Sequence, residues 1–290
     1  MPELPEVETI RNDLSKVIVG KKITNVQVLH KAPVKDGIKK FQIALQNKHV
    51  KKIDRIGKLI AVDLSDGNFL LIHLKMTGQL VYQYDKGFIA GGHSLSGSQE
   101  EKLPGKYTWV VWKFNDGSAL YFNDMRKFGY LRIVSSKEKE RIFATYGPEP
   151  LTKNFTLKIF LKILEKRNAP IKSVLLNQSL IAGIGNIYAD EVCFAARIFP
   201  GRKTSSLSDG EKVDLFKAII SILKKAIKYK GTTFKSYVRT HGRKGNFSDF
   251  LQVYQRDKKE CFRCRKGVIA NKKIGGRSSR YCPVCQKMIQ

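Results

Sequence analysis

The first residues of the chain, Met1-Pro2-Glu3-Leu4-Pro5-Glu6-Val7-Glu8, combine a potential nucleophile with potential acids. If Met1 is removed, Pro2 carries a free secondary amine whose direction is nearly fixed by its ring. Such an amine can attack an electrophilic sugar or carbonyl carbon and form an iminium intermediate. Glu3 lies beside it as a possible proton donor, and Glu6 lies one helical turn further on. The stretch also fits an ordinary helix start, with Pro5 in the first turn and acidic residues favoured by the helix dipole.

The chain is strongly basic. Its 290 residues, enough for two modest domains, include 54 Lys and Arg against 25 Asp and Glu, a formal net charge of +29. The excess is spread along the chain and suits a polyanion such as nucleic acid, because each neutralised phosphate releases counterions. A surface of merely solvated lysines would have the same composition. No apolar run reaches the roughly 18–20 residues of a membrane span and no signal peptide opens the chain, so we expect a soluble, cytoplasmic protein.

Four of the five cysteines form two CxxC pairs near the C-terminus: Cys261, Cys264, Cys282 and Cys285. The 17 residues between the pairs can fold back as a hairpin, expected over Ile269–Tyr281, so that four thiolates surround one tetrahedral Zn²⁺. A redox dithiol would instead need one CxxC on a helix. Because sulfur fills all four positions, we predict a structural zinc and no catalytic cofactor. Arg277 and Arg280 on this hairpin could reach nucleic acid, and Cys193 is expected in an apolar helix.

Two glycines between predicted helices suggest a phosphate contact. Gly183 and Gly185 permit close approach of the backbone, and Asn186 stands at the next helix N-terminus, where exposed N–H groups favour an anion. Lys172, one element upstream, could add a charge. A plain helix hairpin with a glycine cap would explain only one of the two glycines.

Before residue 146 the pattern predicts one helix and then short strands. Apolar residues recur at helical spacing from Val7 to Ile18, and Gly20 ends the helix. Strands rich in Val, Ile, Leu and aromatics follow from Ile23 to about Val134, with tight hairpins at Asp66-Gly67 and Asp116-Gly117. We expect a β-sandwich packed against the first helix, and a surface excursion over about 84–107.

After the linker Gly147-Pro148-Glu149-Pro150 the pattern becomes helical. Helices are predicted over 156–166, from Pro170 to about Asn177, after Gly185, and over about 209–228. Ser208 and Glu211 frame the start of the last one as a capping box. The final 40 residues form a basic module. The predicted division is therefore 1–146, 147–250 and 251–290, in an α+β multidomain chain.

Several of these segments occur in the order seen in one known family. They are Met1-Pro-Glu-Leu-Pro-Glu-Val-Glu-Thr, His73-Leu-Lys-Met76-Thr-Gly, Asp124-Met-Arg126-Lys-Phe128-Gly, Gly147-Pro-Glu-Pro-Leu, Ala182-Gly-Ile-Gly-Asn-Ile-Tyr-Ala-Asp-Glu, Gly231-Thr-Thr-Phe and the terminal cysteine motif. With them the chain resembles the bacterial formamidopyrimidine-DNA glycosylases over nearly its whole length. The resemblance implies an N-terminal β-sandwich with a leading helix, a helix–two-turns–helix domain and a C-terminal zinc-finger hairpin, with DNA across the cleft.

The resemblance also implies roles for individual residues. Pro2 would be the nucleophile that attacks C1′, Glu3 the acid/base that assists sugar-ring opening, and Lys58 and Arg277 phosphate contacts that complete the catalytic set. Met76, Arg126 and Phe128 would fill the gap left by an extruded base. The other residues expected at the DNA are Glu6, His73, Lys172, Asn186 and the loop that begins at Gly231, with Thr232, Thr233 and Tyr237. Glu191 would be a structural support that steadies the turn.

The implied reaction is excision of an oxidised purine from double-stranded DNA followed by cleavage at the abasic site, as in base excision repair, by a monomer. A related possibility is an endonuclease VIII-like enzyme for oxidised pyrimidines, although Leu4 and the Gly-Thr-Thr-Phe segment favour purines. A third possibility is a non-catalytic zinc-finger DNA-binding protein. Two features depart from the family pattern, namely a CxxC spacing one residue longer and a longer segment at 84–107.

Overall fold

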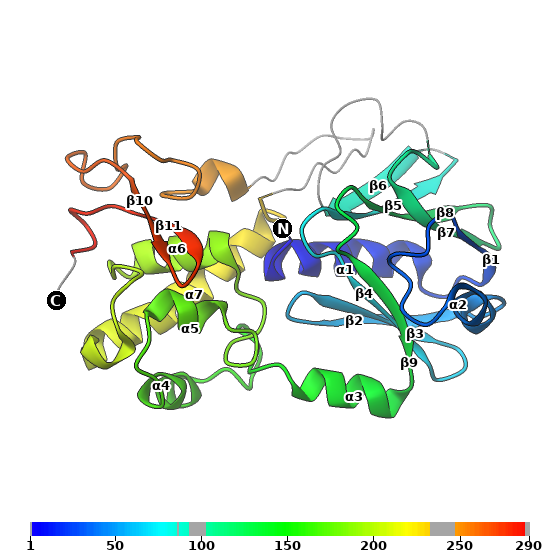
Figure 1. The fold of residues 1–290 in the computed structure, drawn as a ribbon, viewed down its shortest axis with the longest axis horizontal. Coiled ribbons are helices and arrows are strands. Elements are labelled where there is room, and N and C mark those ends of the chain that lie inside the picture. The colour runs from blue at the N-terminus through cyan, green and yellow to red at the C-terminus, as the bar shows by residue number, and fades with distance from the viewer. Residues whose placement is uncertain (1, 86, 93–102, 233–246, 288–290) are drawn as a thin grey trace. The chain divides into compact units, whose positions relative to one another are not determined.

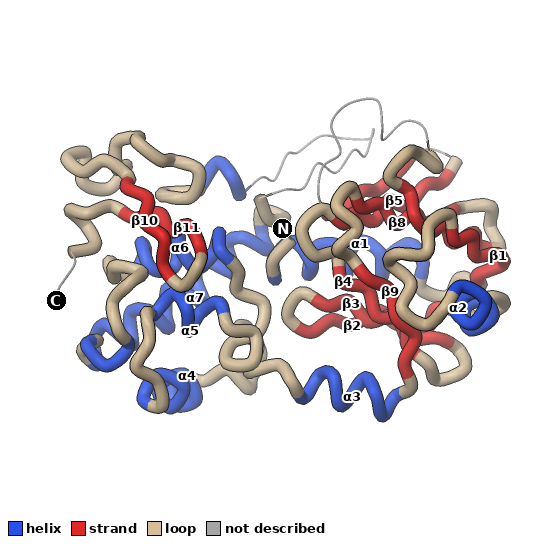
Figure 2. The backbone as a smooth tube through the Cα atoms, viewed as in Figure 1, coloured by secondary structure: helices blue, strands red, loops and turns tan. Residues whose placement is uncertain are grey.

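Two antiparallel sheets fill the N-terminal part of the chain (Figures 1 and 2). The computed structural model describes residues 2–85, 87–92, 103–232 and 247–287. The five-stranded sheet has the order β1 (Ile23–Val28), β7 (Thr108–Phe114), β8 (Ala119–Asp124), β5 (Gly78–Tyr84) and β6 (Gly87–Gly92). The four-stranded sheet has the order β2 (Val50–Ile56), β3 (Leu59–Leu64), β4 (Phe69–His73) and β9 (Tyr130–Val134).

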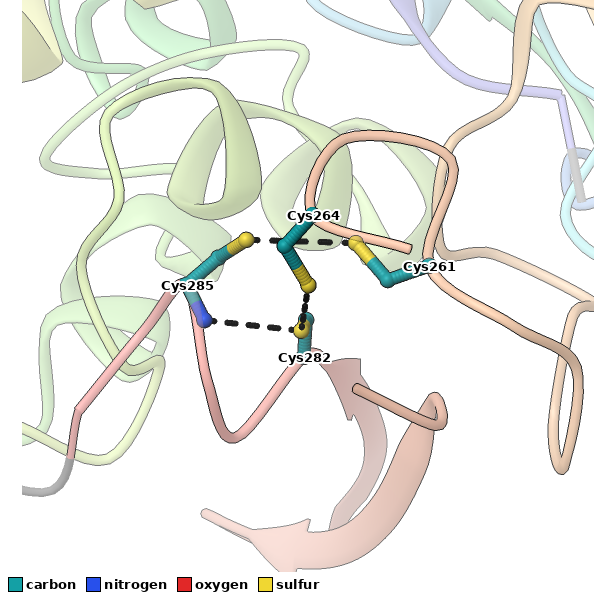
Figure 3. A group of neighbouring side chains, drawn as sticks. All are labelled: Cys261, Cys264, Cys282 and Cys285. Atoms are coloured by element: carbon teal, nitrogen blue, oxygen red, sulfur yellow. Dashed lines mark hydrogen bonds between the residues drawn. The ribbon is translucent and has the colours of Figure 1, made fainter. Parts of the chain in front are cut away.

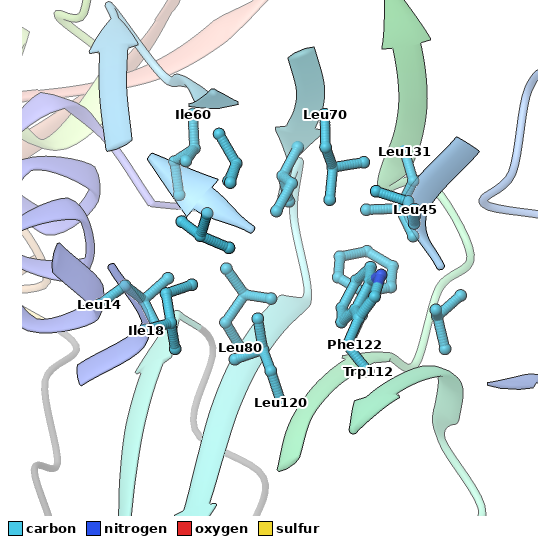
Figure 4. Packing of buried hydrophobic residues seen from close by; sticks show 14 of the residues in the cluster. Leu14, Ile18, Leu45, Ile60, Leu70, Leu80, Trp112, Leu120, Phe122 and Leu131 are labelled. Atoms are coloured by element: carbon cyan, nitrogen blue, oxygen red, sulfur yellow. The ribbon is translucent and has the colours of Figure 1, made fainter. Parts of the chain in front are cut away.

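The facing sides of the two sheets share one apolar core, which confirms the predicted sandwich. Trp112 and Phe122 from the larger sheet meet Ile60 and Leu70 from the smaller one (Figure 4). Helix α1 (Leu4–Ile18) closes one side of this core, with Leu14 and other apolar residues at helical spacing turned inward. Burial of this apolar surface fixes where the N-terminal end of α1 lies relative to the strands.

Both predicted Asp-Gly hairpins are present. Gly67 joins β3 to β4 with φ +83°, and Gly117 joins β7 to β8 with φ +82°. Backbone with positive φ suits glycine, which has no Cβ to clash. The local turn chemistry therefore predicted these two connections.

Two elements differ from the prediction. The segment expected as a surface excursion contains strand β6, which pairs with β5 and buries Ala90 on the outer face of the larger sheet. Residues 93–102 of that segment lie outside the described residues. Helix α2 (Ile38–Leu45) interrupts the region predicted as strands, and it buries Phe41 and Leu45, four residues apart, against the sandwich.

The described residues of 145–228 and 247–290 form a second compact unit, while those of 1–144 and 229–246 form the first. The second unit holds α4 (Leu157–Glu165), α5 (Ile171–Leu176), α6 (Asn186–Ala195) and α7 (Asp209–Lys228), then the hairpin of β10 (Ala270–Ile274) and β11 (Arg277–Tyr281). The helix α3 (Ser136–Ala144) precedes it. This compact unit contains both the helices and the hairpin, so it does not separate residues 147–250 from residues 251–290. The boundary at 250 therefore stays a prediction.

The capping box of α7 is confirmed. The backbone N–H of Ser208 donates to Glu211, and the backbone N–H of Glu211 donates to the Ser208 hydroxyl. No helix among the described residues is long and apolar enough to cross a membrane.

Candidate active site and nucleic-acid contacts

The peptide that follows Pro2 is held by a capping box at the start of α1. The Glu3 backbone N–H donates to Oε2 of Glu6 at 2.9 Å, and the Glu3 carboxylate accepts from the Glu6 backbone. Pro2 is buried, and Glu3 and Glu6 are 1% and 0% exposed. These contacts confirm the ordinary helix start, and a reactive N-terminus at the same residues stays a prediction. Met1 lies outside the described residues.

The second oxygen of the Glu6 carboxylate binds the segment after α7. Its Oε1 accepts from the backbone N–H of Thr232 at 2.8 Å and from the Thr232 hydroxyl at 3.2 Å. The expected contact of Glu6 with DNA is therefore replaced by contacts within the protein. Gly231 and Thr232 are described, whereas Thr233 and Tyr237 of the same expected loop lie outside the described residues.

Lys58 lies in the turn between β2 and β3, directly after Gly57, and is 6% exposed. This turn is tied to α1 through Arg55, whose Nε donates to Glu8 Oε2 at 2.6 Å and whose guanidinium also donates to the Gly57 carbonyl at 3.3 Å. Because the Arg55 and Glu8 side chains are only 9% and 13% exposed, this ion pair is shielded from solvent. Neither Arg55 nor Glu8 was predicted from the sequence to have a role at the site.

His73 is a neutral imidazole in this fold. Burial, then the positive charges of Lys75 and Lys58, lower the pKa of His73 to about 3. Its Nδ1 accepts from the Lys75 backbone N–H at 3.0 Å, as only an unprotonated nitrogen can. The geometry therefore does not support a cationic contact from His73 to phosphate.

The three residues expected to fill the gap of an extruded base lie in two turns of the sandwich. Met76 is 37% exposed and Phe128 54% exposed, and the Arg126 guanidinium lies 4.8 Å from the centre of the Phe128 ring. Exposed apolar side chains that gather at neighbouring turns, unlike single scattered ones, can mark an interaction site. Their exposure therefore supports the expected role without testing it.

Asp124, which sequence analysis quoted without a role, joins these two turns. One carboxylate oxygen accepts from the Thr77 hydroxyl and, at 3.1 Å, from the Arg126 backbone N–H; the other accepts from Gly129 N–H at 2.7 Å. Asp124 is 0% exposed, so its charge is satisfied entirely by such donors. The available signal was a charged residue at the end of an apolar strand, in the first position of the Asp-Met-Arg-Lys-Phe-Gly motif.

The glycine turns before α6 are organised by Gln178. Its side chain donates to the Ile184 carbonyl at 2.8 Å and accepts from Gly183 N–H at 2.9 Å. Asn186 begins α6, and its buried side-chain oxygen has no hydrogen-bond partner among the described residues. Buried polar atoms are usually paired, so a water or ligand is the ordinary partner for such a group. A phosphate contact at Asn186 stays a prediction.

The expected phosphate contact by Lys172 is wrong for this fold. Its side chain is 0% exposed, and the ammonium donates to Asp190 Oδ1 at 2.6 Å, the Ser278 carbonyl at 2.8 Å and the Ser279 hydroxyl at 2.8 Å. Asp190 also accepts from the Arg280 backbone N–H at 3.0 Å. Burial raises the pKa of Asp190 to about 6, against the opposing effect of Lys172, so the pair is charged above that pH. Lys172 binds the hairpin to α5 and α6.

Glu191 steadies a turn other than the glycine turns. Its carboxylate accepts from the consecutive backbone N–H groups of Gln252, Val253 and Tyr254 at 2.9–3.1 Å. Glu191 is 1% exposed, and burial raises its pKa despite the opposing effect of these three donors. It therefore fixes the segment that leads into the cysteine module.

The hairpin presents one of its two candidate arginines. Arg277 starts β11 and is exposed next to the Gly275-Gly276 turn. Arg280 instead donates to Asp257 at 3.0 Å and lies over the Tyr254 ring. Arg277 is therefore the residue of this hairpin that fits a phosphate contact.

The four cysteine sulfurs converge at the base of this hairpin (Figure 3). All four lie within 4.8 Å of one another; Cys261 and Cys285 are 3.9 Å apart, and Cys264 and Cys282 are 3.7 Å apart. Four ligands at about 2.3 Å around a tetrahedral Zn²⁺ would be about 3.8 Å apart. The backbone N–H groups of Lys266 and Gly267 lower the pKa of Cys264 to about 6, whereas burial raises the pKa of Cys282 and raises that of Cys285 to about 12, so a bound metal would have to displace protons from these two thiols. The residues fit a four-thiolate metal site. Cys193 is buried in α6, away from this cluster, as predicted.

A β-sandwich with a leading helix, glycine turns before a helix and a hairpin with four cysteines at its base are together the features of one class of DNA glycosylases. Comparison with known proteins agrees with this class. The model of the formamidopyrimidine-DNA glycosylase N-terminal domain matches residues 1–131, and the model of its H2TH domain matches residues 146–238. The chain belongs to the formamidopyrimidine-DNA glycosylase family.

Individual relatives match along the full length. The formamidopyrimidine-DNA glycosylase of Pelotomaculum thermopropionicum is 40% identical over 99% of this chain and 100% of its own, and that of Streptococcus pneumoniae is 36% identical over 99% of both. A Lactococcus lactis Fpg variant in complex with Fapy-dG containing DNA is 35% identical, with a TM-score of 0.85 over 99% of this chain and 100% of that one. Wild-type Lactococcus lactis Fpg in complex with oxidised pyrimidine containing DNA has a TM-score of 0.84.

Proposed function

We propose that this protein excises oxidised purines from duplex DNA and then cleaves the strand at the abasic site, with the Pro2 amine as nucleophile after removal of Met1. The observation that carries the proposal is the buried capping box that holds the Pro2–Glu3 peptide in one orientation. A nucleophile held in a near-attack geometry gains rate without further binding energy. The model of the formamidopyrimidine-DNA glycosylase N-terminal domain matches residues 1–131, which include this opening segment.

In the proposed reaction the neutral Pro2 nitrogen attacks C1′, and the glycosidic C–N bond breaks as the base leaves with a proton. Protonation of O4′ by Glu3 opens the sugar, and loss of the amine proton gives an iminium. The iminium accepts electrons when the C2′ proton is removed, so the 3′ phosphate leaves, and a second elimination releases the 5′ phosphate. Water then frees Pro2.

The other residues of the site bind and orient DNA in this proposal. Lys58 and Arg277 would each contact phosphate, and Met76, Arg126 and Phe128 would replace the extruded base, which offsets a flipping cost of a few kcal/mol. Cys261, Cys264, Cys282 and Cys285 would hold one Zn²⁺. The ion would supply no chemistry to the reaction and would hold the hairpin that carries Arg277.

Borohydride trapping tests the nucleophile. Wild-type protein lacking Met1, as verified by intact mass, should form a covalent adduct with an 8-oxoguanine duplex, and Pro2→Gly should reduce the yield strongly because the ring no longer fixes the amine. Equal adduct yield from Pro2→Gly, or full nicking by protein that retains Met1, would contradict the proposal.

A second candidate substrate is an oxidised pyrimidine, because a Lactococcus lactis relative has been crystallised with DNA of that kind. Excision rates on matched 8-oxoguanine and thymine-glycol duplexes separate the two. A non-catalytic DNA-binding protein would instead bind both duplexes and release neither base.

A further inference from the structure

Glu6 is a buried carboxylate shared between the N-terminus and a segment more than 220 residues away in sequence. Its Oε2 accepts from the Glu3 backbone N–H at 2.9 Å, and its Oε1 accepts from the backbone N–H and the hydroxyl of Thr232. With 0% exposure, this carboxylate depends on protein donors for its solvation. Each oxygen accepts from a different segment of the chain, so the group cannot rotate without the loss of hydrogen bonds.

Gly231 is the residue that allows this approach. It adopts φ +76°, and an added Cβ would lie 2.5 Å from Glu6 Oε1, 2.8 Å from Cγ and 2.9 Å from Cδ. A side chain at position 231 would therefore face a strained backbone and push directly on the Glu6 carboxylate. The need for glycine here comes from α1, within the same compact unit.

We propose that Gly231 and Thr232 are positioning residues for the Pro2 nucleophile, and that they act through Glu6. The Glu3 N–H belongs to the peptide bond that follows Pro2, so a fixed Oε2 fixes the plane of that peptide. Rotation about the Pro2 Cα–C bond is then the one backbone rotation that still sets the direction of the buried ring. Thr232 holds Oε1 and thereby orients Oε2. This inference rests on the proposed role of Pro2, and it differs from the expected role of residues 231 and 232 as contacts to the lesion.

Three substitutions separate the steps of this linkage. Glu6→Gln provides only one acceptor oxygen, whereas the Glu3 N–H and the Thr232 donors each need one. The amide nitrogen must then face an N–H donor, and the resulting misplacement can lower the rate of adduct formation about a hundredfold. Gly231→Ala should lower it about ten- to a hundredfold through the same displacement. Thr232→Val keeps the backbone donor and loses only the hydroxyl bond, so we expect a loss of only about two- to tenfold.

The test uses a duplex with a preformed abasic site, which offers no damaged base to recognise. Under single-turnover conditions at saturating DNA, the borohydride trapping rate should fall for Gly231→Ala and Glu6→Gln at every pH at which the wild-type protein reacts. The Kd of each variant for the same duplex should stay within about twofold of the wild-type value. Thr232→Ser, which keeps both donors, should restore the wild-type rate. Glu165→Gln and Thr24→Val change exposed residues on α4 and β1 and serve as matched controls. Wild-type trapping rates in Gly231→Ala, with weaker binding to lesion duplexes only, would overturn the inference.

Hydrogen exchange of the Glu3 amide in the DNA-free protein gives a readout independent of activity. The Glu3 N–H should lose protection in Glu6→Gln and Gly231→Ala but not in the two control variants. Unchanged protection refutes the linkage even if Pro2 is the nucleophile. If the wild-type protein forms no Pro2-dependent adduct but the Glu3 amide loses protection as expected, the proposed function fails and the linkage of Glu3, Glu6 and Thr232 stands.

Discussion

Replacement of Lys172 by methionine tests whether this residue binds phosphate or holds the fold together. The ammonium is 0% exposed and donates three hydrogen bonds, one of them to the equally buried Asp190. Methionine keeps most of the side-chain volume but leaves the Asp190 carboxylate buried without its counter-charge. Loss of one partner of a buried ion pair costs about 3–5 kcal/mol of unfolding free energy.

A double-mutant cycle measures the same interaction from the other side. Asp190→Asn leaves the ammonium unpaired and should cost a similar amount, whereas Lys172→Met with Asp190→Asn removes both charges and keeps an acceptor for the Arg280 N–H. We expect the double variant to lose less than the sum of the single variants by at least about 2 kcal/mol. Urea unfolding of metal-loaded protein at pH 7.5, where Asp190 is ionised, provides these free energies.

DNA binding provides the second half of the test. Lys172→Met should leave the slope of log Kd against log salt concentration unchanged, because a residue inside the protein releases no counterion from DNA. Arg277→Ala should reduce the magnitude of that slope by about 1. A reduction of about 1 for Lys172→Met, combined with a stability loss below about 1 kcal/mol, would refute the structural role.

Three further perturbations follow from the site. Below about pH 6.5 the unfolded chain protonates His73, whereas the folded chain does so only near pH 3, so this residue should lower the free energy of unfolding by about 2 kcal/mol between pH 7 and pH 5. His73→Gln should remove that part of the decrease, as measured by urea titrations at the two pH values. A decrease of the same size in His73→Gln would exclude His73 as its cause. Cys282→Ser should abolish binding of about one zinc ion per chain, measured by elemental analysis, while Cys193→Ala should keep it. Glu8→Gln should lower the free energy of unfolding in urea by about 1–3 kcal/mol, because it leaves the shielded Arg55 guanidinium without a counter-charge. The same free energy of unfolding in Glu8→Gln and Glu165→Gln would contradict this.

Features with a local cause could be predicted from the sequence. The Asp-Gly hairpins, the Ser208–Glu211 capping box and the two CxxC pairs each depend on residues a few positions apart, and the structure confirms them. Strand β6 had no such signal, because Gly-rich residues 87–92 become a strand only through pairing with β5.

The partners of charged residues could not be predicted in the same way. Lysines are rarely fully buried, so a surface role for Lys172 was the reasonable expectation. Its burial depends on Asp190, on α6, and on Ser278 and Ser279, on the hairpin, more than 100 residues away. Asp124 likewise acquires its role of joining two turns only once the turn with Thr77, 47 residues away in sequence, lies beside it.

The three glutamates of the opening segment show how one helix start can serve both packing and chemistry. A favourable interaction with the helix dipole would be available to any exposed acid in the first turn. Glu3 and Glu6 are instead buried, and each of the three has its own partner: the Glu6 backbone for Glu3, Thr232 for Glu6 and Arg55 for Glu8. Buried carboxylates persist only where donors satisfy them, so these contacts explain why acids are needed at these positions. The same contacts fix the peptide after Pro2 and the turn that carries Lys58, so the stability of this helix start and the placement of the proposed nucleophile have one physical origin.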